Sequence, residues 1–425
     1  MKTISHLMNI LTGTASDALL LPLYGQDLPA KKQRLLKLLR AFGDKYGDDR
    51  EVMIFSVPGR SELAGNHTDH NHGCVIAGSI DLDMIAVAAP REDGVMHIES
   101  EGFEELLVTP DGTLAPDEAY FGTSHALVAG MANGFRDGGL HVGGFDAMAT
   151  SDVLRGSGLS SSAAYEVMIG TILNHLYNEG KVDAVTVAKL SQRAENLFVG
   201  KPCGLMDQCA CAVGGIIAID FADPTAPVVE AVPFDLTAAG YALCIVDTGG
   251  NHADLTPDYA SVPAEMKAVA RALGQPVLRG LSEEAVIASM AALRESCGDR
   301  AVLRALHFFA ENKRVGNMLA ALKSGDLKAY FEGVLSSGRS SFCYLQNVYT
   351  TANVREQGLS LALRLCEDLD VAAHRVHGGG FAGTVQAYVA TDKVQEFRTA
   401  TEAVFGKGSC HVLHVRTVGA ACIAL

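Results

Sequence analysis

The stretch Arg155-Gly-Ser-Gly-Leu-Ser-Ser-Ser-Ala-Ala-Tyr-Glu-Val167 joins a glycine-rich turn to a long apolar segment. Gly156 and Gly158 allow a ligand to approach the backbone closely, and three consecutive serines supply hydroxyl groups. A helix that begins at these serines leaves its first amide groups unpaired at a positive helix end. The stretch therefore predicts an anion-binding loop, and a nucleotide phosphate is the anion that it favours. A serine-capped buried helix without a ligand is the alternative.

A second glycine-rich stretch, Gly378-Gly-Gly-Phe-Ala-Gly383, has the literal spacing G-x-G-x-x-G. The strand-like sequence TVQAYVA at 384–390 follows it where a dinucleotide-binding fold needs a helix, so a Rossmann site is excluded. The Walker sequence G-x-x-x-x-G-K-[ST] occurs nowhere in the chain, so the first loop is not a P-loop. For the second stretch, a tight turn between strands and a functional loop both remain open.

Hydrophobic periodicity predicts helices and strands on both sides of the anion-binding loop. Helices are expected at 162–178 and 182–200, and the first is apolar nearly all round, so we expect it to be buried. A third helix is expected within the amphipathic segment 300–325. Strands are expected at 51–60, 74–80, 82–91, 95–100, 105–113, 216–222, 241–249, 384–390 and 411–417. The pattern indicates a mixed α/β or α+β fold in two halves that meet near Gly214 and Gly215.

Length, charge and cysteine content limit the class of protein. A chain of 425 residues with 48% hydrophobic residues is globular and long enough for two domains. Its formal net charge of −15, without a basic run, makes nucleic acid an unexpected partner. We expect no signal peptide, and the sequence contains no apolar run of about 18 residues. Ten scattered cysteines without CxxC pairs favour reduced thiols, so we expect a cytoplasmic protein that does not bind membranes.

Four stretches resemble the motifs of the galactokinase family, a branch of the GHMP small-molecule kinases, and occur in the family's order. They are VPGRSELAGNHTDHNHG at 57–73, GSGLSSSA at 156–163, AENLFVGKPCGLMDQ at 194–208 and HGGGFAG at 377–383. The resemblance implies an α+β, two-domain GHMP kinase fold, with a ribosomal-S5-like N-terminal domain at 1–214 and a ferredoxin-like C-terminal domain at 215–425. It also implies an active site in the cleft between the two domains.

The resemblance further implies an activity and a set of site residues. The activity is ATP-dependent phosphorylation of a sugar at C1, with galactose as the expected sugar and Mg²⁺ as the metal. Asp207 is the expected catalytic carboxylate, and Arg60 is its partner. The expected phosphate-binding residues are Gly156, Ser157, Gly158, Leu159, Ser160, Ser161 and Ser162. The expected metal ligands are Ser162 and Glu195, and the expected sugar contacts are Asn66, His67, Thr68, Asp69, Gly204 and Tyr259.

The chemistry of these residue types agrees with the implied roles. Magnesium prefers oxygen ligands and is usually held by one or two protein groups together with phosphates and water. A carboxylate beside a guanidinium is held in its charged form, so Asp207 beside Arg60 can accept the proton of a sugar hydroxyl. Without the motifs, Glu195 would be interpreted as a solvated helix carboxylate and Arg60 as half of a surface ion pair.

Asn66 departs from the family pattern, because it stands where the family has a glutamate that meets the hydroxyl at the far end of the sugar. An amide in place of the carboxylate weakens that hydrogen bond by about 1 kcal/mol, so galactose can still bind. The change also removes a repulsion of about 4 kcal/mol toward a uronate carboxylate. We therefore expect relaxed specificity at C6, and galacturonate or another C6-modified sugar is an alternative substrate.

Two functions from other classes also remain open. A non-catalytic sensor of galactose and ATP on the same scaffold needs only the binding groups, but the expected catalytic and metal-binding residues are all present. A metallohydrolase could be built on His67, His70 and His72 if the three rings converged on a zinc ion. The expected partners are a small-molecule sugar and ATP, and we expect a monomer or a weak homo-oligomer.

Overall fold

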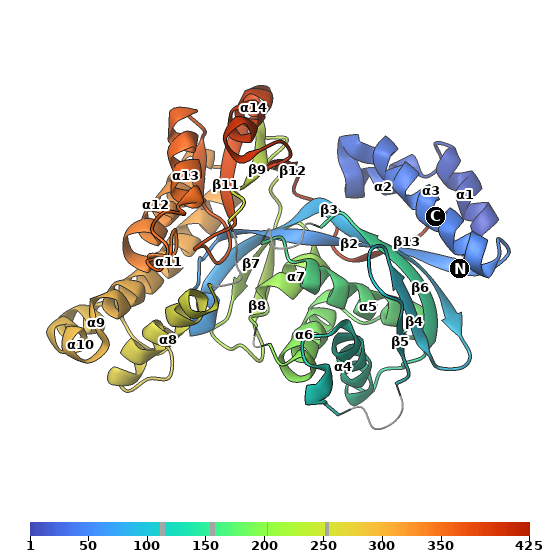
Figure 1. The fold of residues 1–425 in the computed structure, drawn as a ribbon, viewed down its shortest axis with the longest axis horizontal. Coiled ribbons are helices and arrows are strands. Elements are labelled where there is room, and N and C mark those ends of the chain that lie inside the picture. The colour runs from blue at the N-terminus through green and yellow to red at the C-terminus, as the bar shows by residue number, and fades with distance from the viewer. Residues whose placement is uncertain (111–114, 154–157, 202, 251–254) are drawn as a thin grey trace.

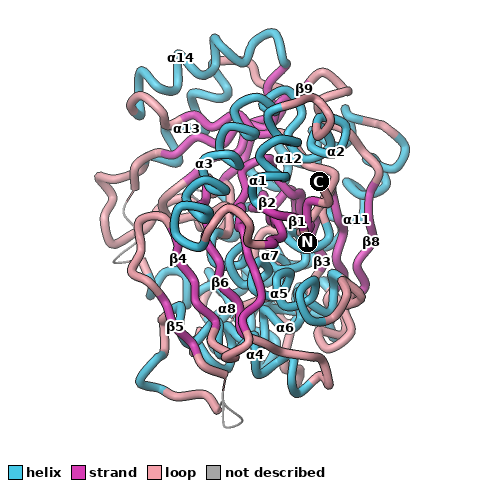
Figure 2. The backbone as a smooth tube through the Cα atoms, turned by 90° about the vertical axis from the view of Figure 1, so that its right-hand side faces the viewer, coloured by secondary structure: helices cyan, strands magenta, loops and turns pink. Residues whose placement is uncertain are grey.

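The computed structural model describes residues 1–110, 115–153, 158–201, 203–250 and 255–425. Within these residues, the chain builds two β-sheets and packs helices around both (Figure 1). The larger sheet crosses the middle of the molecule, and the smaller sheet stands among the helices of the C-terminal half (Figure 1). Figures 1 and 2 both place the two chain ends close together, beside the N-terminal helices.

Nine strands of the described residues form the larger sheet, in the order β1-β2-β3-β6-β4-β5, with β13 also paired to β2, β7 to β3 and β8 to β7. The strands are β1 Lys2–Thr3, β2 Glu51–Ala64, β3 Cys74–Arg91, β4 Met96–Ser100, β5 Leu106–Val108, β6 Gly144–Ser151, β7 Ile216–Asp220, β8 Val228–Val232 and β13 Ala421–Ile423. β2 and β3 are antiparallel, with Phe55 opposite Ala86 and Val57 opposite Met84, and they form the centre of the sheet.

Different helices cover the two faces of the larger sheet, because side chains alternate along each strand. Ile54 and Val87 belong to the apolar cluster of one face, which contains α1 (Ile4–Thr12), α2 (Asp17–Tyr24) and α3 (Leu28–Tyr46). Phe55 and Ala86 belong to the cluster of the other face. That face is covered by α4 Ser124–Asp137, α5 Ser161–Tyr177, α6 Ala184–Ala194 and α7 Met206–Val213. Figure 1 shows α1 to α3 in blue and α4 to α7 in green on opposite sides of the sheet.

The predicted anion-binding loop at 156–162 is called the serine loop below. The helix at its end, α5, is the central element of this layer. α5 contacts β2 and β3 on one side and α4, α6 and α7 on the others. Because it is surrounded, most of its apolar residues are buried, and Val167 and Ile172 are each 1% exposed or less. The burial expected for this helix is confirmed.

Four described strands form the smaller, antiparallel sheet, in the order β10-β11-β9-β12. The strands are β9 Tyr241–Asp247, β10 Ala373–Val376, β11 Thr384–Ala390 and β12 Cys410–Leu413. The helices of this half are α8 Thr256–Ala272, α9 Glu283–Ala288, α10 Met290–Cys297, α11 Asp299–Ser324, α12 Leu327–Ser340, α13 Gly358–Asp368 and α14 Val394–Phe405. The second glycine-rich stretch connects β10 to β11.

Most of the expected elements are confirmed, with three differences. The strand expected at 105–113 is the short strand β5, Leu106–Val108, and residues 111–113 lie outside the described residues. The strands expected at 74–80 and 82–91 are one strand, β3, because Asp81 and Asp83 are buried within it rather than exposed in a turn. The helix expected at 182–200 is regular only to Ala194, and it ends as a π-helix at Glu195–Val199. A π-helical turn changes the direction of the side chains that follow it, and such turns are frequent at functional sites.

The division of the chain at 214 and 215 remains a prediction, and the sheets do not follow it. β7 and β8 come after residue 215 yet extend the larger sheet, and β13 returns to β2 at the end of the chain. One apolar cluster joins the halves, since it contains Tyr330 as well as Val57. All ten cysteines are free thiols. None of the helices in the described ranges is long and apolar enough to cross a membrane.

Candidate active site

Arg60 lies where β2 is irregular. The register of β2 against β3 shifts between Pro58 and Arg60, and such irregularities redirect side chains and are common next to active sites. Gly59 has to be a glycine, because a Cβ atom there would lie 2.8 Å from the carbonyl oxygen of Leu159. The Arg60 N–H donates to the same carbonyl at 3.2 Å. The sequence Pro-Gly-Arg therefore brings β2 into direct contact with the serine loop.

Arg60 and Asp207 form a bidentate ion pair. Arg60 Nε donates to Asp207 Oδ1 at 2.8 Å, and Nη2 donates to Oδ2 at 2.6 Å, which fixes the plane of the carboxylate. Burial lowers the pKa of Arg60, but the charge and hydrogen bonds of Asp207 outweigh burial and raise it. The Arg60 side chain is buried, whereas 33% of the Asp207 side chain is exposed. The carboxylate is thus held on one side and open on the other.

The described part of the serine loop contacts this ion pair. Gly158 and Ser160 have positive φ angles of 72° and 60°. The Gly158 carbonyl accepts from Arg60 Nη1, and the Ser160 hydroxyl donates to Asp207 Oδ2. Ser160 occupies the N-cap position of α5, but its side chain does not cap the helix, so the first amide groups of α5 are left for a ligand. Gly156 and Ser157, two of the expected phosphate contacts, lie outside the described residues.

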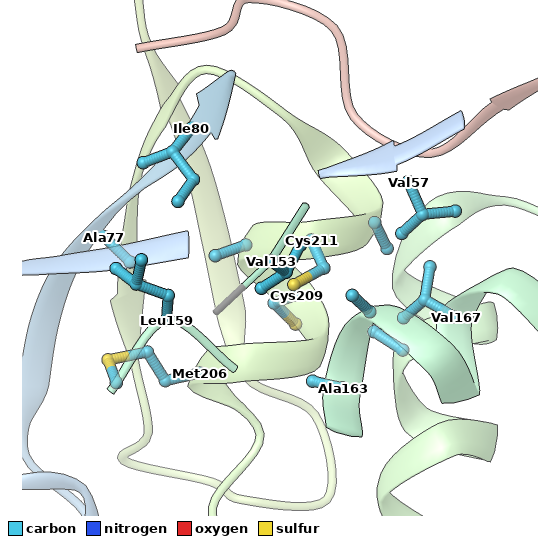
Figure 3. Packing of buried hydrophobic residues seen from close by; sticks show 14 of the residues in the cluster. Val57, Ala77, Ile80, Val153, Leu159, Ala163, Val167, Met206, Cys209 and Cys211 are labelled. Atoms are coloured by element: carbon cyan, nitrogen blue, oxygen red, sulfur yellow. The ribbon is translucent and has the colours of Figure 1, made fainter. Parts of the chain in front are cut away.

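An apolar cluster packs around the serine loop and the start of α7 (Figure 3). Leu159 is fully buried and lies close to Met206, the first residue of α7. Its side chain therefore anchors the loop and does not face a phosphate. Cys209 and Cys211 of α7 belong to the same cluster, and burial raises the pKa of both thiols above its ordinary value. The cysteines act as small buried residues.

Residues 65–73 form a tight loop between β2 and β3, which we call the sugar loop because it carries four of the expected sugar contacts. Gly65 has a φ angle of 96°, and a Cβ atom there would lie 2.5 Å from the carbonyl oxygen of Cys74, so the position requires glycine. The Thr68 hydroxyl lies 2.9 Å from the Gly65 carbonyl and 2.7 Å from the Cys74 carbonyl, and the residue is fully buried. Thr68, an expected sugar contact, instead uses its hydroxyl to close the loop.

Asn66 also differs from its expected role. Its side chain is fully buried. Nδ2 donates to Glu62 Oε1 at 3.1 Å and to the Gly378 carbonyl at 2.7 Å. Oδ1 accepts from Asn347 Nδ2 at 2.8 Å and from Ser341 Oγ at 3.2 Å. These four bonds use both donors and both acceptor positions of the amide. In this structure the Asn66 side chain therefore has no donor or acceptor left for the C6 group of a sugar.

Asp69 and Gly204 lie side by side, although 135 residues separate them in the sequence: 204 − 69 = 135. A Cβ atom at Gly204 would clash with Asp69 Oδ2, so glycine is needed for the carboxylate to fit. The Asp69 side chain is 18% exposed, which leaves part of it for a ligand. Gly204 precedes Asp207 by three residues at the entry to α7. The expected sugar contact Asp69 therefore lies next to the segment that carries Asp207.

The second glycine-rich stretch packs against the sugar loop. His67 Nε2 donates to the Gly379 carbonyl at 2.9 Å, and Asn347 Nδ2 donates to the same carbonyl at 3.1 Å. The Tyr259 hydroxyl donates to the Gly380 carbonyl at 2.7 Å. Burial lowers the pKa of His67 to about 4, so its ring is neutral at pH 7. The stretch is a turn between strands and at the same time bonds to three of the expected sugar contacts, Asn66, His67 and Tyr259.

His377 is a site residue that sequence reasoning missed. Its ring is buried and lies 3.0 Å from Ser61 Oγ and 2.9 Å from Thr384 Oγ1. A Cβ atom at Gly158 would lie 3.3 Å from His377 Nδ1, so the ring packs directly behind the serine loop. Burial and then the charge of Arg60 hold its pKa well below 6.5. A neutral histidine therefore joins the two glycine-rich stretches.

Glu166, Glu195 and Gln208 form a buried group that we call the acidic cluster. Glu166 follows Ser162 by four residues in α5, so the two lie on the same face of the helix. Glu195 is 4% exposed and is therefore not a solvated helix carboxylate. Gln208 Nε2 lies 3.0 Å from Glu195 Oε2 and 3.1 Å from Glu166 Oε2, which links the two carboxylates. Glu166 was missed, and its signal was a lone carboxylate in an otherwise apolar helix.

The acidic cluster has oxygen atoms without partners. Within the described residues, Glu166 Oε1 and Gln208 Oε1 are buried and accept no hydrogen bond. Burial and the charge of Glu195 raise the pKa of Glu166 well above its ordinary value. Several hard oxygen donors with unused lone pairs fit a divalent cation such as Mg²⁺. Glu195 and Ser162 could hold such an ion, with Glu166 and Gln208 beside it.

The three histidines of the sugar loop do not converge. The ring centroids of His67 and His70 are 6.1 Å apart, and neither ring belongs with His72 to a group of ligating side chains in the part of the chain that the structure describes. The one group of possible metal ligands found in the described residues consists of His97 and Glu99 on β4 and Glu105 just before β5. The geometry therefore does not support a histidine-based metallohydrolase.

Two family models match the chain. The model of the GHMP kinases N terminal domain matches residues 126–215, and the galactokinase galactose-binding signature matches residues 40–90. The first range contains the serine loop, the acidic cluster and Asp207. The second contains Arg60 and the sugar loop.

Relatives match over nearly the whole chain. The galactokinase of Streptomyces coelicolor is 32% identical and covers 86% of this chain and 91% of its own length. Human galactokinase is 31% identical and covers 84% of this chain and 88% of its own length. The crystal structure of Lactococcus lactis galactokinase complexed with galactose matches with a TM-score of 0.78 at 26% identity, covering 91% of this chain and 99% of that one. The crystal structure of Methanococcus jannaschii mevalonate kinase shares the fold, with a TM-score of 0.61 at 15% identity. The match covers 86% of this chain and 98% of that one.

Proposed function

The chain belongs to the galactokinase family of the GHMP kinases, and from this premise we propose that it transfers the γ-phosphoryl group of ATP to the C1 hydroxyl of galactose. The single observation that carries the proposal is the position of the Arg60–Asp207 ion pair. The pair contacts the serine loop on one side through Gly158 and Ser160. On the other side, Asp207 follows Gly204 by three residues, and Gly204 touches Asp69.

Asp207 has one acceptor position left for a substrate. A carboxylate offers about four lone-pair sites, and those of Asp207 accept from Arg60 Nε, Arg60 Nη2 and Ser160 Oγ. The remaining site can accept the C1 hydroxyl of the sugar. In the reaction that hydroxyl gives its proton to Asp207 and its oxygen bonds to the γ-phosphorus. The bond from the γ-phosphorus to the bridging oxygen breaks at the same time and leaves ADP.

Arg60 has two roles in this arrangement. It holds the carboxylate of Asp207 in a fixed plane, so that the acceptor position points in one direction. Its guanidinium also reaches the serine loop, where it bonds to the Gly158 carbonyl. A fixed positive charge at this place stabilises the negative charge that spreads over the oxygens of the transferring phosphoryl group.

The triphosphate is proposed to lie at the N-terminus of α5. The amide groups of its first turn and the hydroxyls of Ser161 and Ser162 are the donors available there. Ser162 and Glu195 are the proposed ligands of Mg²⁺, and Glu166 and Gln208 orient Glu195. Magnesium, when bound, would neutralise phosphate oxygens during the transfer. The partnerless oxygens of the acidic cluster support this assignment.

The sugar is proposed to bind against Asp69, His67 and Gly204. The Asp69 carboxylate can accept from two neighbouring hydroxyl groups, which is a common way to orient a pyranose ring. Tyr259 and Asn66 are proposed to shape this place indirectly, because both bond to the second glycine-rich stretch. Since the Asn66 amide is used within the protein, it gives no support to a preference for galacturonate, and galactose is the proposed acceptor.

A coupled assay of ADP release with Mg-ATP over galactose, galacturonate and glucose tests the proposal. We expect galactose to be the fastest acceptor. Asp207→Asn should lower kcat about 10²-fold to 10⁴-fold, the range for loss of a positioned proton acceptor, without preventing folding. A protein that binds galactose and ATP but releases no ADP would be a sensor, and this result would contradict the proposal. Activity of Asp207→Asn close to that of the wild type would reject the assigned role of Asp207.

A further inference from the structure

Lys201 is joined to Glu195 by its main chain and by its side chain. The Lys201 N–H donates to the Glu195 carbonyl at 3.1 Å, and Lys201 Nζ donates to Glu195 Oε1 at 2.9 Å. The π-helix Glu195–Val199 and Gly200, whose φ angle is 74°, reverse the chain so that residue 201 lies over residue 195. Lys201 occupies a free position of the motif at 194–208, so the resemblance gives it no role.

The two side chains of this ion pair have opposite environments. The Glu195 carboxylate is 5% exposed, while 66% of the Lys201 side chain is exposed. Burial lowers the pKa of Lys201, but the charge and hydrogen bond of Glu195 outweigh burial and raise it overall. The ammonium is therefore a largely exposed positive charge that pairs with a buried carboxylate. It lies in the electrostatic field of both Glu195 and Asp207.

We propose that Lys201 competes with the metal ion for Glu195, holding this carboxylate in the metal-free enzyme and leaving it when the magnesium nucleotide binds. The inference rests on the proposed function, because it takes Glu195 as a metal ligand. An ammonium and a divalent cation cannot both contact Glu195 Oε1 at close range, since their positive charges repel each other. Lys201 can leave easily, because most of its side chain is already in solvent.

Removal of the Lys201 ammonium should raise the affinity for the metal ion, and by a modest factor. An ion pair with an exposed partner is weak, so its loss should tighten metal binding only about threefold to fivefold. The effect should decrease as salt concentration rises, because salt screens the exposed ammonium. In return, Lys201 keeps Glu195 paired while no metal is present, which limits the repulsion between Glu195 and Glu166.

A titration of Mn²⁺ into the protein saturated with the non-hydrolysable analogue adenylyl imidodiphosphate, followed by the electron paramagnetic resonance of free Mn²⁺, tests the inference without turnover. We expect Lys201→Met to bind Mn²⁺ about threefold to fivefold more tightly than the wild type. Lys201→Arg, which keeps the charge, should restore the wild-type affinity to a large extent. Lys181→Met removes an ammonium from an exposed pair with Glu179 and should leave the affinity unchanged.

A double-mutant cycle with Glu195→Gln separates the possible results. We expect Lys201→Met to have no effect on Mn²⁺ affinity in the Glu195→Gln background. An effect of equal size in both backgrounds would show that Lys201 acts on the nucleotide phosphates, and it would overturn the inference. Unchanged or weaker binding by Lys201→Met alone would do the same. If Glu195→Gln binds Mn²⁺ as tightly as the wild type, the proposed metal site itself is wrong and the inference falls with it.

Discussion

Two buried carboxylates of the same half of the molecule, Asp83 and Glu166, have opposite surroundings. Both are fully buried. Asp83 lies among cations, with Arg34 Nη1 at 2.5 Å and Arg416 Nη1 at 3.5 Å, and it also accepts from the Tyr24 hydroxyl at 3.0 Å. Glu166 receives one bond from Gln208 and has a partnerless oxygen. The difference indicates that the first carboxylate serves stability and the second is reserved for a ligand.

The pKa values of the two carboxyl groups are also shifted in opposite directions. Burial raises the pKa of both groups, but Arg34, Arg416 and Lys31 lower that of Asp83 below its ordinary value. At Glu166 the charge of Glu195 raises the pKa further, and the opposing effects of the Gln208 hydrogen bond and the Lys201 charge are too small to offset burial. A fully compensated buried charge strengthens a fold only while all of its partners are present. An uncompensated one costs stability until a cation arrives.

Asp83→Asn should have the largest effect on stability. The substitution keeps the shape but leaves Arg416 buried without its full compensating charge. We expect the free energy of unfolding in urea to fall by about 3–5 kcal/mol. The kcat of the folded enzyme should change little, since Asp83 bonds to none of the site residues that the structure describes. Asp17→Asn is the matched control, because its pair with Lys32 is partly exposed and should contribute under about 1 kcal/mol.

Glu195→Gln should lower activity without lowering stability, which is the reverse of the effect expected for Asp83→Asn. The loss of a proposed metal ligand is expected to lower kcat/KM for Mg-ATP about 100-fold or more. The free energy of unfolding should not fall, because a like-charge contact with Glu166 disappears. Glu230→Gln, which removes an exposed partner of Lys323, controls for the change in net charge. If Glu195→Gln unfolds the protein and leaves kcat/KM of the remaining folded fraction intact, the two carboxylate regions do not differ as described.

Glu166→Gln should have a smaller effect on activity and a favourable effect on stability. We expect about a tenfold rise in the Mg²⁺ concentration that gives half-maximal rate, which is the lower end for residues that orient a metal ligand. The new amide can donate to Gln208 Oε1, which has no partner in the described structure, and so raise the free energy of unfolding by about 1 kcal/mol. Parallel urea unfolding and Mg²⁺ titrations measure both. A destabilised variant would contradict the interpretation.

Lowering the pH should narrow the stability gap between the wild type and Asp83→Asn. Burial raises the pKa of Asp83, but the charges of Arg34, Arg416 and Lys31 bring it below 3.8. A folded pKa below the unfolded value means that the charged form stabilises the fold above the unfolded pKa, about 3.9. That contribution is lost as the pH falls through the folded pKa. Urea unfolding at pH 7, 5 and 3 measures the gap, and a gap that widens below pH 4 would contradict the assignment.

The sequence predicted the parts of the site that local pattern or motif determines. The glycines and serines at 156–162 indicated an anion-binding helix start, and the apolar helix that follows is buried as expected. The motifs identified Arg60 and Asp207, whose contact joins residues 147 apart and leaves no local signal. Glu195 became interpretable only with its motif, since its position at the edge of an apolar stripe also fits a solvated carboxylate.

What the sequence did not predict depends on contacts between distant segments. Asn66 was expected to face C6 of the sugar, but Asn347 and Gly378, which are 281 and 312 residues away, use its amide. Thr68 was expected to bind sugar, but its hydroxyl is used by the carbonyls of its own loop. β7 and β8 follow the expected boundary at 214 and 215, and strand pairing assigns them to the larger sheet. Periodicity indicates a strand but not its neighbour.

Calorimetric binding of adenylyl imidodiphosphate, with and without Mg²⁺, tests most directly the claim that the acidic cluster is reserved for a cation. For the wild type and for Asp83→Asn, we expect Mg²⁺ to tighten binding at least about tenfold. For Glu195→Gln, we expect most of this dependence on Mg²⁺ to disappear. The same dependence on Mg²⁺ in Glu195→Gln as in the wild type would contradict the claim, because the Glu195 carboxylate of the acidic cluster would then have no part in holding the metal.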